Sequence, residues 1–193
     1  MEENVKSLVE ARMPTKFGDF KLIAFPGDSK DKEDLALVTG EIKDNPLVRI
    51  HSECFTGDVL HSMRCDCGEQ LDLAMQRISE ERSGIIVYLR QEGRGIGLVN
   101  KLKAYNLQDE GMDTVEANIA LGFRAELRDY DNASKILKNM GIDKVRLLTN
   151  NPAKVEELEK KGFVVEQVAH KAEANDENRD YLETKASKMN HKL

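Results

Sequence analysis

The stretch GIIVYLRQEGRGIGLVNKLK, residues 84–103, decides the fold class. Its first seven residues, 84–90, are an apolar run bounded by glycine and charge, which predicts a buried strand. A glycine-rich turn follows, and Leu98, Leu102 and Tyr105 then share one face of a predicted helix. A buried strand that leads through a short turn into a helix is typical of α/β proteins.

The same alternation of strands and helices continues on both sides of this stretch. Upstream, Leu71, Met75 and Ile78 recur at helical spacing and predict a helix just after Gly68. We therefore expect a single α/β domain over 1–193, of layered α/β/α type, with a mixed sheet and a β-rich N-terminal part. The polar tail, 170–193, is predicted to be partly disordered in the absence of ligand or partner. The remaining predicted strands are 17–25, 35–42, 46–53, 144–149 and 163–168, and the remaining predicted helices are 131–140 and 152–161.

The composition of the chain argues against several classes of partner and location. The chain has 193 residues, 33% of them charged, a net charge of −6 and no tryptophan. An acidic chain that is poor in aromatic residues argues against nucleic acid and anionic membranes as partners. No apolar run is long enough to span a membrane, and the acidic N-terminus does not resemble a signal peptide. These features predict a cytoplasmic protein whose thiols are reduced.

All three cysteines, Cys54, Cys65 and Cys67, lie within fourteen residues. Three thiolates that converge on one point suit Zn²⁺, and three protein ligands leave a position for water, as in catalytic zinc sites. Two alternatives remain open. His51 or His61 could be a fourth ligand of a structural zinc, or the thiols could be reduced and hold no metal.

Two predicted helix starts could bind phosphate. Arg90 and Arg94 flank the glycines of the central stretch, where backbone N–H groups at a helix N-terminus can face an anion. Thr149 and Lys154 lie at a second strand-to-helix junction. The alternatives are a tight glycine turn at the first junction and ordinary helix capping by Asn151 at the second.

Four segments in this order and spacing resemble GTP cyclohydrolase II, an enzyme family of riboflavin biosynthesis. They are RIHSECFTGDVLHSMRCDCGEQL, RQEGRGIGLVNKLKAYNLQDEGMDTVEAN, LGFRAELRDY and LLTNNPAKVEEL. The resemblance implies that GTP loses C8 as formate and also loses pyrophosphate, which leaves 2,5-diamino-6-(5-phosphoribosylamino)pyrimidin-4(3H)-one. It further implies one catalytic Zn²⁺ on the three cysteines, Mg²⁺ with the triphosphate, and a monofunctional homodimer.

The resemblance also assigns residues. Arg128 matches the arginine that attacks the α-phosphate, and Glu126 stands where the family has its aspartate base. Tyr105 matches the tyrosine that supports ring hydrolysis, and relatives that lack it are thought to stop at a formylated intermediate. Glu92 is implied to read the guanine donors. The positions that match GTP contacts are Arg49, Ile50, His51, Ser52, Glu53, Gln70, Glu92, Gly93, Arg94, Thr114, Thr149 and Lys154.

Two other functions remain possible from the sequence. One is a structural zinc module that binds nucleotide or nucleic acid without chemistry. The other is an enzyme of the same scaffold that retains the formyl group or releases only pyrophosphate.

Overall fold

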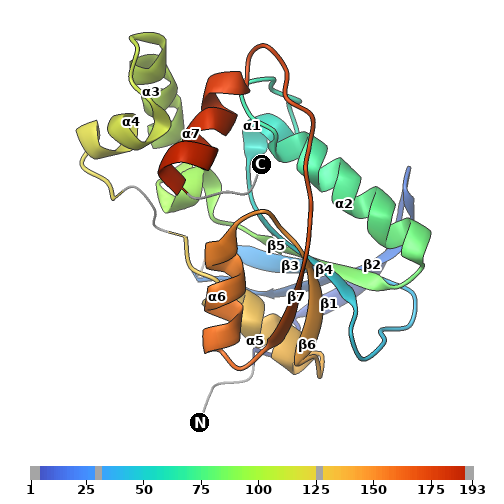
Figure 1. The fold of residues 1–193 in the computed structure, drawn as a ribbon. Helices are drawn as coiled ribbons and strands as arrows, with labels where there is room; N and C mark the ends of the chain where they lie inside the picture. Colours follow the sequence, from blue (N-terminus) through green and yellow to red (C-terminus); the bar gives the residue numbers. More distant parts are fainter. Residues whose placement is uncertain (1–4, 29–31, 125–127, 190–193) are drawn as a thin grey trace.

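One mixed seven-stranded sheet organises the chain (Figure 1). The computed structural model describes residues 5–28, 32–124 and 128–189. The strands run in the order β1-β2-β3-β5-β4-β6-β7. Their bounds are β1 Val9–Thr15, β2 Gly18–Pro26, β3 Glu33–Thr39, β4 Leu47–Ser52, β5 Gly84–Leu89, β6 Lys144–Leu148 and β7 Val164–Val168.

The sheet has an antiparallel half and a parallel half. β1, β2, β3 and β5 pair antiparallel, whereas β4 pairs parallel with both β5 and β6, and β6 pairs parallel with β7. The first five residues of β4 are buried, as expected of a strand covered on both faces. The predicted α/β class with a mixed sheet is confirmed.

Helices cover both faces of the sheet. α2 (Cys67–Glu81) packs on one face, where Ile78 is fully buried. α5 (Asp131–Asn139) and α6 (Pro152–Lys160) pack on the other, where Ile136 and Leu158 are fully buried. Burying one such side chain contributes about 1.5–3 kcal/mol. These two apolar layers stabilise the packing of the helices on the two faces of the sheet.

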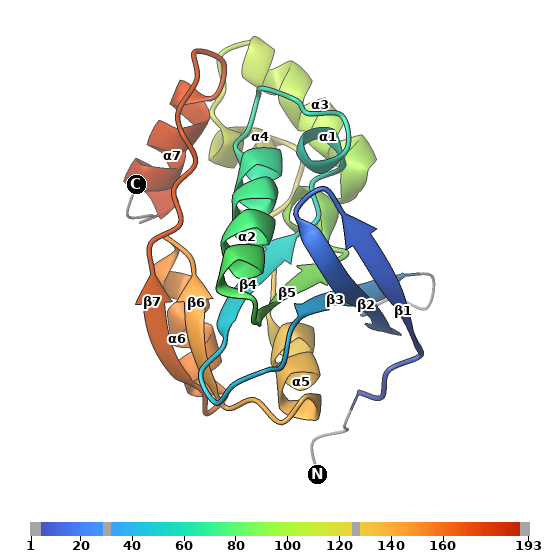
Figure 2. The same cartoon turned by 90° about the vertical axis from the view of Figure 1, so that its right-hand side faces the viewer.

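A cap of helices lies beyond the carboxyl ends of the parallel strands (Figure 2). In α/β sheets, ligands bind outside this end of the strands. No helix among the described residues is long and apolar enough to cross a membrane. The helices of the cap are α1 (Phe55–Asp58), the 3₁₀ helix η1 (Glu92–Gly95), α3 (Gly97–Asp109), α4 (Thr114–Ala120) and α7 (Arg179–Met189).

One expectation from the sequence is corrected by this cap. α3 forms, but Leu102 on its predicted apolar face is 46% exposed, and the buried residues are Lys101 and Ala104. The reason is that α3 lies at the end of the sheet and not on its apolar face. In the polar tail, residues 179–189 form α7, and the partial disorder expected without ligand or partner stays a prediction.

The elements that were not predicted include β1 and α4. β1 is an edge strand of mostly exposed residues, so its sequence lacks the apolar alternation of a half-buried strand. α4 begins with a capping box in which Asp113 and Glu116 bond each other's backbone N–H groups. The D-x-x-E spacing is a known helix-start pattern and would have revealed α4.

Candidate functional site

The three cysteines meet at the carboxyl end of β4. Their sulfur atoms all lie within 4.8 Å of one another, and the Sγ atoms of Cys54 and Cys65 are 3.6 Å apart. That distance is far too long for a disulfide. It is close to the roughly 3.8 Å between two sulfurs that bind one tetrahedral Zn²⁺ at about 2.3 Å. The chemistry and spacing of this donor set therefore fit zinc.

Two glycines allow the loop to close around the thiols. A Cβ on Gly57 would lie 3.0 Å from the sulfur of Cys65 and 3.1 Å from the Cβ of Cys67. A Cβ on Gly68 would lie 2.3 Å from the carbonyl oxygen of Gly57. The backbone approaches itself too closely here for any larger residue.

Neither histidine considered as a fourth ligand joins the cysteines. The Nε2 atom of His51 lies 3.1 Å from Oδ1 of Asp58, and its ring stacks on Tyr88. His61 is exposed. Within the described ranges, the three cysteines are the only group of three or more potential ligands that converges in this way. The arrangement therefore favours an open site over a four-ligand structural one.

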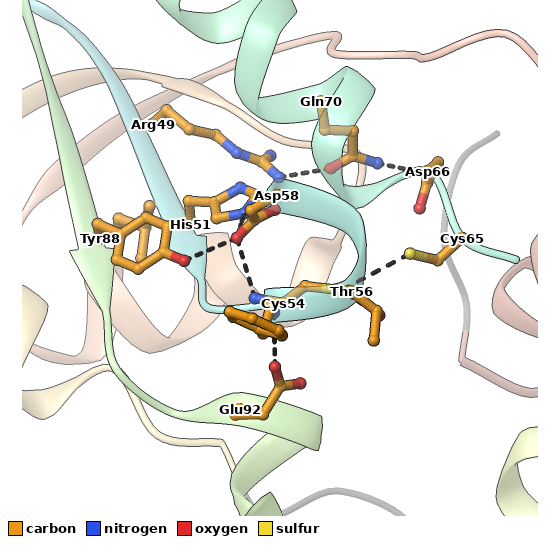
Figure 3. Close-up of polar contacts among 12 residues, drawn as sticks. Arg49, His51, Cys54, Thr56, Asp58, Cys65, Asp66, Gln70, Tyr88 and Glu92 are labelled. Carbon is orange, nitrogen blue, oxygen red and sulfur yellow. Dashed lines mark hydrogen bonds and ion pairs between the residues drawn. The ribbon is translucent and has the colours of Figure 1, made fainter. Parts of the chain in front are cut away.

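Asp58 fixes the backbone of the first cysteine (Figure 3). Its carboxylate accepts hydrogen bonds from the N–H of Cys54 at 3.0 Å and from the hydroxyl of Tyr88 at 2.7 Å. Burial lowers the pKa of His51, which keeps the imidazole neutral beside Asp58 near neutral pH. These three linked side chains were not identified from the sequence, because nothing local links Tyr88 to residues 51–58.

Lys101 and Glu92 support the cysteines from the other side. The Nζ atom of Lys101 lies 3.0 Å from the sulfur of Cys54 and 2.9 Å from Oε1 of Glu92. Glu92 also accepts hydrogen bonds from the N–H groups of Phe55 and Gly93, both at 2.6 Å. Three protein donors thus engage a carboxylate that the resemblance assigns to guanine. Hydrogen bonds from Cys65 and Cys67, followed by the charge of Lys101, lower the pKa of the Cys54 thiol.

Two pockets open beside the cysteines and share a wall. The thiol pocket contains the three cysteines, Lys101 and Tyr105. The basic pocket contains the cationic side chains of Arg49, Arg128, Lys154 and Lys185, and none of its described lining residues is acidic. Both pockets are lined by Ser52, Cys67, Arg128 and Tyr181.

Most of the predicted site residues divide between these two pockets. Ile50 lines neither: its side chain is fully buried, and its carbonyl oxygen accepts a hydrogen bond from Nζ of Lys154 at 2.7 Å. Glu126 lies outside the described residues. The thiol pocket contains Ser52, Glu53, Glu92, Gly93, Arg94, Tyr105, Thr114 and Arg128, and the basic pocket contains Arg49, His51, Ser52, Gln70, Arg128, Thr149 and Lys154.

Tyr105 lines the thiol pocket and is linked to Cys54 through Thr56. Its hydroxyl lies 3.4 Å from Oγ1 of Thr56, which in turn lies 3.7 Å from the sulfur of Cys54. Burial raises the pKa of Tyr105, so its hydroxyl keeps its proton near neutral pH. The ring packs under the guanidinium of Arg64, 4.7 Å from the ring centroid. Packing and a role in the pocket are therefore compatible for this residue.

In the basic pocket, protein carbonyl and amide oxygens position the cations. Arg49 donates to the carbonyl oxygen of Leu148 at 2.9 Å and to the side-chain oxygen of Gln70. Burial lowers the pKa of Arg49 to about 10, so it remains charged at neutral pH. Cations that are fixed in advance around a pocket suit a polyanionic ligand.

Comparisons with known proteins show which family the chain belongs to. A family model for GTP cyclohydrolase II matches residues 6–170. The chain belongs to the GTP cyclohydrolase II family. It is 52% identical over 190 residues to the GTP cyclohydrolase-2 of Actinobacillus succinogenes, covering 97% of this chain and 88% of that protein. It is 51% identical over 191 residues to the GTP cyclohydrolase-2 of Pasteurella multocida, with 97% and 87% covered.

A longer relative shows the same similarity over part of its length. The riboflavin biosynthesis protein RibBA of Chlorobium phaeovibrioides is 52% identical over 192 residues, which cover 98% of this chain but 47% of that protein. The family resemblance found in the sequence is confirmed. The chain is therefore an enzyme of the GTP cyclohydrolase II family, with a role in riboflavin biosynthesis.

Proposed function

We propose that this GTP cyclohydrolase II uses one Zn²⁺, held by Cys54, Cys65 and Cys67, to open the imidazole ring of GTP. The products are formate, pyrophosphate and 2,5-diamino-6-(5-phosphoribosylamino)pyrimidin-4(3H)-one. The observation that carries this proposal is the shared wall of the two pockets. One pocket has three thiols that suit zinc, and the other has four cationic side chains that suit a triphosphate.

The side chains divide the work between the two pockets. Arg49 and Lys154 bind the triphosphate in the basic pocket. This orientation directs the guanine base of GTP toward the thiol pocket. When bound, zinc supplies a Lewis acid that lowers the pKa of water near an electrophilic carbon. The protonated hydroxyl of Tyr105 supports hydrolysis of the ring by hydrogen bonding. Glu53, on the rim of the thiol pocket, is directed by Arg90, whose Nε lies 3.0 Å from its carboxylate.

Arg128 lies where the two pockets join, so the proposal places it beside the α-phosphate. A guanidinium is a poor nucleophile until it loses a proton to a base. We assign that base to Glu126, which precedes Arg128 by two positions in the sequence. Mg²⁺ accompanies the triphosphate in this proposal, because phosphate oxygens are among the ligands that Mg²⁺ prefers.

For Glu92, the geometry favours a role different from reading guanine. Its carboxylate already accepts hydrogen bonds from Lys101 and from the N–H groups of Phe55 and Gly93. We therefore propose that Glu92 holds the loop that carries Cys54, and that it contacts the nucleotide at most through its remaining acceptor position.

The test is to incubate the purified protein with GTP and Mg²⁺, and to assay formate, pyrophosphate and zinc per chain separately. We expect both products and about one zinc per chain. Cys65→Ser should abolish formate but leave pyrophosphate release, because the two reactions use different groups. Met63→Ser, on the same loop and 57% exposed in the wild type, is the matched control and should behave as wild type.

Unchanged formate release from Cys65→Ser would refute the zinc assignment. Pyrophosphate without formate in the wild type would favour the alternative enzyme that retains the formyl group. Zinc without either product would favour the binding module.

We further propose that the chain is a single-domain cytoplasmic homodimer. Val99, Leu102 and Ile119 on α3 and α4 are 68%, 46% and 60% exposed, and exposed apolar side chains of this size are common at interfaces. Sedimentation of the purified protein tests the oligomeric state, and a monomer at micromolar concentration would contradict the proposal.

A further inference from the structure

The C-terminal helix α7 is fastened to the loop that carries the cysteines. Nζ of Lys185 lies 2.5 Å from Oδ1 of Asp66, and these residues are only 7% and 1% exposed. Asp66 stands between Cys65 and Cys67. The ion pair therefore joins segments that are 119 positions apart at the point where the loop presents two of its sulfurs.

The ion pair also extends into the basic pocket. Oδ2 of Asp66 accepts a hydrogen bond from Nε2 of Gln70 at 2.5 Å, and Oε1 of Gln70 accepts one from Arg49 (Figure 3). Lys185 is thus connected through two side chains to one of the fixed cations of the pocket. A movement of α7 would change the surroundings of Arg49.

Tyr181 presents its ring at the junction of the two pockets. It is one of four residues that line both. The guanidinium of Arg94 lies 6.0 Å from the ring centroid on the thiol-pocket side, and Nζ of Lys185 lies 4.5 Å from it. A cation that lines each pocket thus lies near the ring face, and both contacts favour this position of the ring.

The turn before α7 is held by hydrogen bonds between asparagine side chains and backbone N–H groups. Asn175 accepts hydrogen bonds from the N–H groups of Glu177 and Asn178, and Asn178 accepts one in return from the N–H of Asn175. Asn178 is fully buried. The helix therefore begins at an anchored position and leads Tyr181 and Lys185 into the site.

We propose that α7 completes the nucleotide site: Tyr181 is the wall between the part that binds the base and the part that binds the triphosphate, and the Lys185–Asp66 pair holds this wall on the cysteine loop. Tyr181 and Lys185 are positioning residues in this role. The inference rests on the proposed function, because it assumes that one nucleotide occupies both pockets.

The experiment compares steady-state kinetics and zinc content of Tyr181→Ala, Tyr181→Phe and Lys185→Met in the full chain. The matched control is Arg179→Met on the same helix, because Arg179 is exposed and forms an exposed ion pair with Asp176. We expect Tyr181→Ala to raise KM for GTP about tenfold while zinc per chain stays at the wild-type value. Tyr181→Phe keeps the ring and should restore KM to within about twofold of wild type.

Lys185→Met should also raise KM, because Asp66 then lacks its cation. A purely structural role of α7 would lower the melting temperature of the variants without changing KM. Wild-type KM in zinc-loaded Tyr181→Ala would therefore overturn the proposal. A Phe variant as impaired as the Ala variant would overturn the wall role in particular.

A failure of the proposed function gives a different result. If the wild type releases no formate, the same variants are compared by equilibrium binding of GTP. Weaker binding by Tyr181→Ala than by Tyr181→Phe would then support the role of α7 and reject only the chemistry. Equal binding by both variants and the wild type would reject the role of α7 as well.

Discussion

Replacement of Lys101 by methionine should destabilise the cysteine loop and weaken zinc binding. The side chains of Lys101 and Glu92 are only 11% and 5% exposed, so their ion pair is screened little by water. Removing one member of a buried pair generally costs about 3–5 kcal/mol. Glu92 keeps two backbone N–H donors, and the cost should therefore fall at the low end, about 3 kcal/mol.

The zinc site should respond as well. Lys101 donates to the sulfur of Cys54 at 3.0 Å, and removing such an outer partner of a metal ligand typically weakens binding by about 10- to 100-fold. The assays are urea denaturation of the zinc-loaded protein and competition for zinc with a chromogenic chelator. Lys103→Met, at an exposed position of the same helix, is the control.

The double variant Lys101→Met with Glu92→Gln separates the two effects. The amide that replaces the carboxylate of Glu92 carries no charge. At least half of the stability lost in Lys101→Met should therefore return, whereas the loss of zinc affinity should remain. A Lys101→Met protein within about 1 kcal/mol of wild type in stability and within threefold in zinc affinity would refute this reasoning.

Three further predictions follow from the same structure. Gly57→Ala places a Cβ 3.0 Å from the sulfur of Cys65, so we expect a loss of about 1–3 kcal/mol and weaker zinc binding, measured as above. Burial, with the nearby charge of Arg49, lowers the pKa of His170 from 6.5 to about 3. The unfolded chain therefore binds a proton at His170 before the folded protein does. The stabilising effect of neutral His170 is complete above pH 6.5 and is lost as the pH falls. Zinc-free wild type should accordingly lose about 2 kcal/mol more than zinc-free His170→Gln between pH 7 and pH 5 in urea denaturation, and parallel losses would contradict the assignment. Lys154→Met should raise KM for GTP by at least about tenfold with zinc content unchanged, because it removes a cation fixed 2.7 Å from the carbonyl of Ile50, and an unchanged KM would show that the triphosphate lies elsewhere.

Local patterns in the sequence were sufficient for the parallel half of the sheet, for α2, α5 and α6, and for the three cysteines. Apolar runs and helical spacing report directly on burial when an element packs on a sheet face, as for Ile78 and Ile136. The cysteines were found because their chemistry and spacing are themselves the evidence. β1 was missed because an edge strand buries few side chains and leaves no such pattern.

Tertiary contacts decided what surrounds the cysteines. Lys101 is buried and Leu102 exposed because α3 packs against the cysteine loop at the end of the sheet, and no helical period predicts that choice. Lys185 and its partner Asp66 are 119 positions apart, so the polar tail shows no local reason to form a docked helix. The sequence thus determined which chemical groups are present, and the packing of distant segments determined which of them are paired and which face the pockets. The physical reason is that periodicity records only local burial. An ion pair or a pocket wall depends instead on which distant segments of the chain pack together.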